Sequence, residues 1–174
     1  FQVGRVIGGI ITLKRGIELM KRLTPETLGT LSNEMARFMA VRFMDDISAE
    51  PVYPYHLMIC GGTGCYAAKS METKRRLAQA IEDRQIGNKA ILIETGCIGL
   101  CVRGPVMVIH PGGIFYECLR PEHVDEILDQ HILRGRPVER CMYHDPASGR
   151  VIPRLKDIPF FFMQQTRVLR NKGI

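Results

Sequence analysis

Four cysteines in two short pairs constrain the fold of this chain more than any other feature. Cys60 and Cys65 enclose four residues in CGGTGC, and Cys97 and Cys101 enclose three residues in CIGLC. Glycine stands inside or beside each pair, and residues 66–96 separate the two pairs. The loops can serve one site only if the intervening chain folds back and brings both to one end of a sheet.

The chemistry of these loops favours an iron-sulfur site. Thiolates are soft, electron-rich ligands, and four of them complete two tetrahedral irons in a [2Fe-2S] cluster. The flanking glycines let backbone N–H groups approach the sulfurs, where hydrogen bonds offset the charge of the cluster. The expected metal ligands are Cys60, Cys65, Cys97 and Cys101, and the expected cofactor-binding glycines are Gly61, Gly62, Gly64, Gly96 and Gly99.

Two other uses of the cysteines stay open, although the spacing disfavours both. Structural zinc also takes four cysteines, but familiar zinc modules place them mostly at two-residue spacing in knuckle turns. A thiol-disulfide enzyme typically uses CxxC at a helix start, and neither pair has this spacing. The GGTG stretch is only loosely similar to a phosphate-binding loop, because no GK[ST] follows it.

Length and composition indicate one α/β domain with appendages. The chain has 174 residues, of which 45% are hydrophobic. No apolar run reaches the roughly 18 residues of a membrane span. Six cysteines are too few for a disulfide-stapled secreted module, which favours a reducing, cytoplasmic location. The net charge of +6 is dispersed and lacks interleaved aromatic residues, so nucleic-acid binding is not expected.

Residues 1–50 are expected to form a helical extension. Thr24 can cap a helix that has Pro25 at its first position, and apolar residues then recur at steps of three and four up to about Met44. A shorter helix is expected around 13–23. An apolar stripe of this kind most simply packs on the domain or on a partner protein.

Residues 55–135 alternate between strand and helix patterns. The expected order β-α-β-β-β-α is that of a thioredoxin-like domain, and its β-α-β unit should be parallel and right-handed. A hairpin turn is expected at Pro111, and Pro121 opens the last helix. The expected strands are 55–59, 89–94, 106–110 and 114–118, and the expected helices are 67–83 and 121–134.

The remaining segment and three single residues complete the layout. Residues 136–174 are basic, carry four prolines and are expected to form an extended arm. Cys118 and Cys141 do not belong to the site by spacing, and Cys118 is expected to be a small buried apolar residue. His131 lies on the apolar stripe of the last helix, where a hydrogen-bonded, half-buried histidine is expected rather than a ligand.

With the loops and strand order in place, residues 55–135 resemble the thioredoxin-like [2Fe-2S] ferredoxin family. This family includes the small partner of the flavoprotein subunit in respiratory complex I. The loops CGGTGC and ETGCIGLCVRGP look more like one branch of the family, the ferredoxin domain fused ahead of the NADH-binding flavoprotein subunit in NADH-dependent hydrogenases and formate dehydrogenases. The resemblance implies that the four ligands of the family correspond to Cys60, Cys65, Cys97 and Cys101.

The segment IPFFFMQQTRVLRNKGI, residues 158–174, is similar to the segment that opens the flavoprotein domain in those fused subunits. The resemblance implies a continuation that binds FMN, NAD and a [4Fe-4S] cluster. It also implies partners, namely the NADH-binding flavoprotein domain and other iron-sulfur subunits of an oxidoreductase complex. In the fused subunits the first ferredoxin strand lies near the N-terminus, so this resemblance offers no counterpart for residues 1–50.

The sequence therefore predicts one-electron transfer through a [2Fe-2S] cluster in an NADH-linked multisubunit oxidoreductase, with no substrate site in this span. The alternative is an assembly module that holds subunits together, in which a cluster or a zinc ion stabilises the fold.

Overall fold

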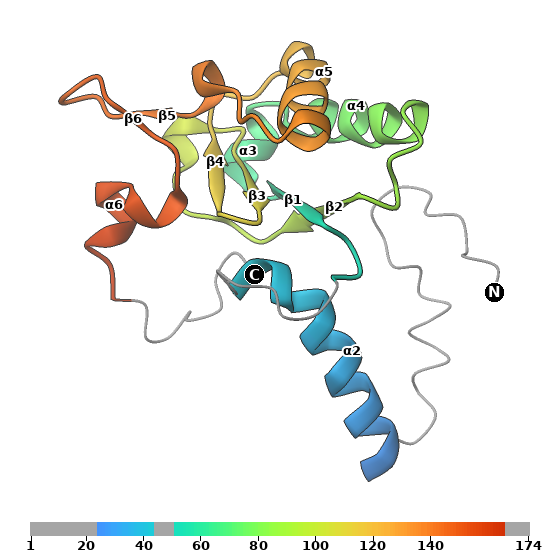
Figure 1. Cartoon of the computed structure of the whole chain (residues 1–174). Coiled ribbons are helices and arrows are strands. Elements are labelled where there is room, and N and C mark those ends of the chain that lie inside the picture. Colours follow the sequence, from blue (N-terminus) through green and yellow to red (C-terminus); the bar gives the residue numbers. More distant parts are fainter. Residues whose placement is uncertain (1–23, 44–50, 166–174) are drawn as a thin grey trace.

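The computed structural model describes residues 24–43 and 51–165 (Figure 1). The helix expected at 13–23 lies outside the described residues, and so does the end of the tail segment, residues 166–174. No helix among the described residues is long and apolar enough to cross a lipid bilayer.

Helix α2 (Pro25–Phe43) begins where the sequence predicts it. The Oγ1 atom of Thr24 accepts the N–H of Thr27 at 3.2 Å, and the N–H of Thr24 donates to Oγ1 of Thr27 at 2.8 Å. Such reciprocal bonds satisfy N–H groups that the first turn leaves without helical partners. Ala40 and Val41 are buried near the end of α2, which lies against the sheet, whereas most side chains of the first turns are exposed.

A four-stranded mixed sheet forms the centre of the molecule. Its strands are β1 (Tyr55–Cys60), β2 (Ala90–Thr95), β3 (Met107–His110) and β4 (Ile114–Tyr116), and their spatial order is β2-β1-β3-β4. Strand β1 pairs in parallel with β2 and antiparallel with β3, which in turn pairs antiparallel with β4. The predicted β-α-β-β-β-α order and the parallel β1/β2 pair are confirmed.

One face of the sheet is covered by α4 (Ser70–Asp83) and by a second helical segment, and Figure 1 shows the two side by side above the sheet. The second segment begins with η2 (Pro121–His123), continues as α5 (Val124–Glu126) and ends in a π-helical stretch, η3 (Ile127–Ile132). Alternate residues of β1, including Leu57 and Ile59, enter the core between the sheet and these helices.

The expected single helix over 67–83 is divided in the structure. A short helix, α3 (Thr63–Ala67), begins inside the first cysteine loop, and α4 starts only at Ser70. Lys69 between them has a φ of 68°, in the left-handed region where a helix cannot continue. The first cysteine loop is therefore partly helical, and Cys65 lies within α3.

The opposite face of the sheet is covered by α2 and by part of the segment expected as an extended arm. Its short elements are η4 (Glu139–Cys141), β5 (Tyr143–His144), β6 (Val151–Ile152), η5 (Leu155–Asp157) and α6 (Pro159–Phe162). The N–H of Phe115 donates to the carbonyl of Pro153 at 2.8 Å, and the N–H of Leu155 donates to that of Gly113 at 2.9 Å. The segment thus lies along the outer edge of β4, and Ile158 is fully buried.

Candidate metal centre

The parallel pairing of β1 with β2 brings the two cysteine loops together. Cys60, the last residue of β1, stands opposite Thr95, the last residue of β2. The N–H of Gly61 then donates to the carbonyl of Thr95 at 2.9 Å, so the loops leave the sheet at the same end and side by side. The convergence expected from the sequence is present in the structure.

Close approach between the loops depends on glycine. A Cβ atom added to Gly62 would lie 3.3 Å from Sγ of Cys97, and one added to Gly64 would lie 3.0 Å from Cβ of Cys101. Gly104, which follows the second cysteine pair, packs against the first loop in the same way, because an added Cβ would lie 3.1 Å from Sγ of Cys65. Each of these three glycines therefore lies against a cysteine from the other loop.

The sulfurs of the second pair have the separation of two ligands on one metal. Sγ of Cys97 and Sγ of Cys101 lie 3.7 Å apart. Two thiolates on a tetrahedral centre with metal-sulfur bonds of about 2.3 Å stand about 3.8 Å apart, which is the edge of that tetrahedron. All six cysteines, each within the described residues, are free of disulfide bonds.

The two pairs differ in exposure. Cys60 and Cys65 are buried, with 2% and 0% of their surface exposed, whereas Cys97 and Cys101 are exposed. The first pair follows the central strand β1, and the second follows the edge strand β2. One half of the site therefore lies in the protein interior and the other half at the surface.

The thiols of Cys65 and Cys101 have raised pKa values and therefore resist ionisation in the absence of a cation. Burial raises the pKa of Cys65 to about 11, and the neighbouring Cys60 and Cys101 add to this effect. The adjacent sulfur of Cys97 raises the pKa of Cys101. Thiolates packed this closely repel one another, and a bound metal removes that cost because it deprotonates its coordinating thiols. The thiol chemistry of this donor set thus suits a group that carries positive metal ions, although no three His, Cys, Asp or Glu side chains of the described residues already stand close enough together to hold one.

The five glycines named from the sequence occupy different environments. Gly62 donates its N–H to Sγ of Cys60 at 3.4 Å, as expected for a glycine that supports a cluster. Gly99 has a φ of 110°, which L-residues rarely adopt, so glycine is needed there for the backbone. Gly61 faces the side chain of Glu94, and a Cβ atom added to Gly96 would have no atom of the described residues within 4 Å.

Sequence reasoning missed one glycine and misjudged one cysteine. Gly104 packs against Cys65, and its only sequence signal is its place in the RGP that follows Cys101. The prediction of a buried Cys118 is wrong, because this residue is exposed and has a φ of 48°. Strand β4 ends at Tyr116, so Cys118 lies in the following turn rather than in the strand. Cys141 is buried outside the site.

Comparison with known proteins gives concordant matches. The sequence profile of the family described as thioredoxin-like [2Fe-2S] ferredoxin matches residues 20–131, so the match includes α2, for which the sequence resemblance offered no counterpart. A 2Fe-2S ferredoxin of Aquifex aeolicus is 38% identical over 79 residues, which are 45% of this chain and 71% of that protein. A subunit of the NADH-quinone oxidoreductase of Rickettsia bellii is 32% identical over 100 residues, which are 55% of this chain and 59% of that protein. The crystal structure of the wild-type thioredoxin-like [2Fe-2S] ferredoxin from Aquifex aeolicus aligns with a TM-score of 0.47 and 33% identity, covering 51% of this chain and 95% of that chain.

Proposed function

Because the chain belongs to the thioredoxin-like [2Fe-2S] ferredoxin family, we propose that Cys60, Cys65, Cys97 and Cys101 hold one [2Fe-2S] cluster through which single electrons pass. The observation that carries this proposal is the convergence of the two loops, with Sγ of Cys97 and Sγ of Cys101 3.7 Å apart. Each loop would supply the two ligands of one iron, because the sulfurs of the second pair have the separation of two thiolates on a single tetrahedral metal.

When bound, such a cluster takes up or releases one electron between its diferric and one-electron-reduced states. The protein contributes the arrangement around it. The buried Cys60 and Cys65 would hold one part of the cluster at the apolar core, and the N–H of Gly62 donates to Sγ of Cys60 at 3.4 Å. The exposed Cys97 and Cys101 would hold the other part near the surface, where a redox partner would have access.

We further propose an NADH-linked context for this electron carrier. The likeness to a subunit of NADH-quinone oxidoreductase supports it, together with the similarity of residues 158–174 to the start of a flavoprotein domain. In this proposal residues 55–135 are the ferredoxin domain, residues 1–50 an extension and residues 136–174 an arm toward the flavoprotein domain. FMN, NAD and a [4Fe-4S] cluster would be held by a continuation of the chain, in a cytoplasmic oxidoreductase complex.

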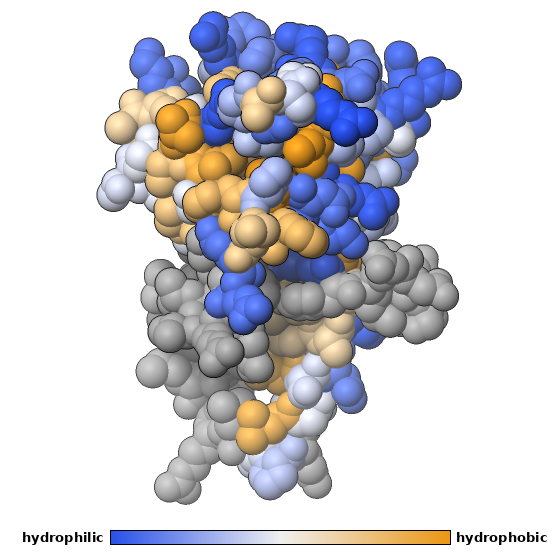
Figure 2. All heavy atoms as spheres, turned by 90° about the vertical axis from the view of Figure 1, so that its left-hand side faces the viewer, coloured by the Kyte–Doolittle hydropathy of each residue, from blue (hydrophilic) through white to orange (hydrophobic). Residues whose placement is uncertain are grey.

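An assembly role is a second candidate, which one surface feature favours. Phe162 and Met163, in and after α6, are 75% and 79% exposed, and Phe160 is 44% exposed. Figure 2 shows the side of the molecule on which α6 lies, where apolar surface gathers between hydrophilic regions. Exposed apolar groups of this kind are typical of surfaces that contact another protein. This role and electron transfer can coexist in one protein.

A redox titration tests the electron-transfer proposal. The purified, anaerobic protein is titrated with dithionite while the absorbance and the electron paramagnetic resonance signal are recorded. We expect a single transition that follows the Nernst equation for one electron, with about 59 mV per tenfold change in the ratio of oxidised to reduced protein. A chain that binds zinc and shows no redox transition would instead support the assembly role alone.

The NADH-linked context needs its own test. The complete protein that contains this sequence is expressed beside the 174-residue chain, and both are mixed with NADH under anaerobic conditions. We expect NADH to reduce the [2Fe-2S] cluster of the complete protein and to leave that of the isolated chain oxidised. Equal behaviour of the two proteins would argue against a flavoprotein continuation.

A further inference from the structure

Arg103 and Glu117 form an ion pair beside the turn that carries Cys101. Arg103 is the last residue of the one-turn 3-10 helix η1 (Cys101–Arg103) and stands two positions after the proposed ligand. Its Nε atom lies 3.6 Å from Oε2 of Glu117, in the turn after β4. The carbonyl of Arg103 also accepts the N–H of Cys118 at 2.8 Å. A backbone hydrogen bond and a side-chain ion pair therefore both connect the two turns.

The Glu117 side chain is buried and has few partners. Only 8% of the residue is exposed, and Oε1 accepts the N–H of His144 at 3.2 Å. Oε2 accepts no hydrogen bond from the described residues. A buried carboxylate is costly unless an opposite charge compensates it, so the guanidinium of Arg103 is the group that stabilises Glu117 in this position.

The C-terminal segment also contacts the side chain of Arg103. Cζ of Arg103 lies 5.7 Å from the centroid of the Tyr143 ring, within the range of a cation-π contact. Tyr143 belongs to β5, and the N–H of Glu117 donates to the carbonyl of Cys141 in the preceding turn at 2.9 Å. Three segments therefore contact one another at the Arg103–Glu117 ion pair: the η1 turn that carries Cys101, the turn after β4, and the C-terminal segment.

We propose that Arg103 is a positioning residue of the cysteine site and that the Arg103–Glu117 pair sets the reduction potential of the group held there. This inference rests on the proposed function, because a potential exists only if the cysteines hold a redox group. Reduction adds one negative charge to a cluster, so a nearby guanidinium stabilises the reduced state and a nearby carboxylate destabilises it. Removing the two charges one at a time should therefore move the potential in opposite directions.

Midpoint potentials of matched variants test this proposal. Arg103→Gln, Arg103→Lys and Glu117→Gln are compared with wild type by electron paramagnetic resonance titration, after iron and acid-labile sulfide have been determined for each. Arg134→Gln, which removes an exposed positive charge after η3, is the control for net charge. We expect a lower potential for Arg103→Gln, a higher one for Glu117→Gln, and values near that of wild type for Arg103→Lys and Arg134→Gln.

The outcomes separate this inference from the proposed function. A wild-type protein without iron and sulfide would overturn the proposed function itself. A wild-type protein with a normal cluster, together with unchanged potentials or shifts of the same sign in Arg103→Gln and Glu117→Gln, would overturn only the role of the ion pair. If Arg103→Gln holds no cluster, the nearly isosteric Glu117→Gln decides: a higher potential supports the proposal, and an unchanged one contradicts it.

Discussion

Gly62 lies against Cys97, so that a Cβ at position 62 would stand 3.1 Å from Cβ and 3.3 Å from Sγ of that cysteine. This contact joins the buried and the exposed halves of the proposed cluster site. It also means that the second loop can keep its position only while residue 62 has no side chain.

Gly62→Ala should therefore weaken cluster binding. The added methyl group must displace Cys97 by a few tenths of an ångström, and changes next to metal ligands typically reduce metal affinity about tenfold or more. Iron bound per chain, measured against increasing chelator concentration, reports the change. Gly87→Ala, outside the two loops, is the control, because no described atom lies within 4 Å of its Cβ position. Equal loss of iron in the two variants would contradict the explanation.

Serine in place of a ligand should remove or strongly perturb the cluster. The four ligand positions are Cys60, Cys65, Cys97 and Cys101. Oxygen is a harder donor than sulfur and suits iron-sulfur chemistry less well. The visible absorption spectrum reports the loss, and the controls are Cys118→Ser and Cys141→Ser, whose thiols lie outside the site. Bleaching by Cys118→Ser as complete as that by Cys97→Ser would show that the ligand set is wrong.

Stability should fall as the pH drops below about 6.5, because three histidines stay neutral in the fold. Burial lowers the pKa of His56, His110 and His131 to about 4. Each of them binds a proton in the unfolded chain near pH 6.5 but in the folded chain only near pH 4, so the folded state is disfavoured progressively between these values. Each group contributes up to about 1.4 kcal/mol per pH unit in this window.

His131→Gln separates this effect from other acid effects. His131 Nδ1 lies 2.9 Å from the hydroxyl of Tyr116, which itself accepts the N–H of Val138 at 3.0 Å. Urea unfolding of wild type and variant at about pH 7 and about pH 5.5 should show a smaller loss of unfolding free energy in the variant. An identical loss in both proteins would mean that His131 does not take part.

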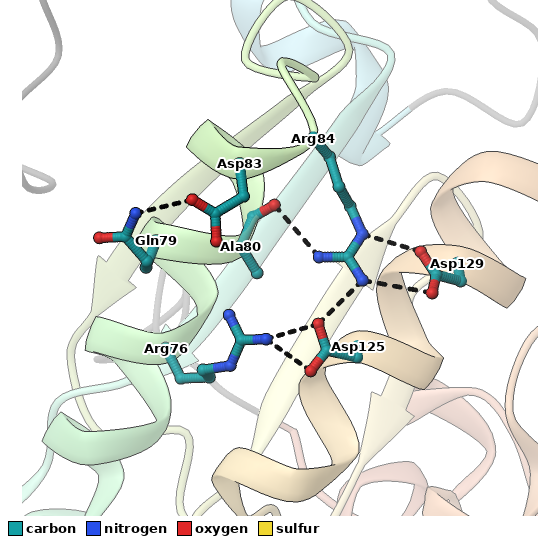
Figure 3. A network of polar contacts seen from close by, with 7 residues as sticks. All are labelled: Arg76, Gln79, Ala80, Asp83, Arg84, Asp125 and Asp129. Carbon is teal, nitrogen blue, oxygen red and sulfur yellow. Dashed lines mark hydrogen bonds and ion pairs between the residues drawn. The ribbon is translucent and has the colours of Figure 1, made fainter.

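Arg84→Gln should destabilise the packing of α4 on α5. Nε of Arg84 donates to Asp129 at 2.8 Å, and its Nη2 donates to Asp125 at 2.8 Å. Asp125 also accepts a hydrogen bond from Arg76, so the four side chains form one network (Figure 3). Ion pairs at a surface contribute about 1 kcal/mol or less, and less at high salt. Urea unfolding at low and high salt measures the change, with the exposed Arg75→Gln on the same helix as the control. A change of the same size for both arginines would argue against the network.

The sequence predicted the central domain well because its signals are local. Strand patterns, the cap at Thr24 and the turn at Pro111 each depend on a few neighbouring residues, and the predicted element order is confirmed. The resemblance to the thioredoxin-like [2Fe-2S] ferredoxins, seen in the cysteine loops, is confirmed by the family match. The helix break at Lys69 was missed, because a lysine in left-handed conformation has no local sequence signal.

Other features arise only from contacts between distant segments. The arm at 136–165 has weak periodicity because it forms backbone hydrogen bonds to the edge of β4 rather than a regular element of its own. The ion pair of Arg103 and Glu117 joins residues from two turns, and neither residue is unusual in the sequence. The role of Gly104 against Cys65 is likewise visible only in the folded chain.

The central claim is that two cysteine pairs hold one [2Fe-2S] cluster, and metal analysis tests it most directly. The chain is purified anaerobically, iron, acid-labile sulfide and zinc are determined, and electron paramagnetic resonance spectra are recorded before and after reduction with dithionite. An all-cysteine [2Fe-2S] site requires about two irons and two sulfides per chain, with a paramagnetic signal that appears on reduction. One zinc per chain with no sulfide and no signal would contradict the account.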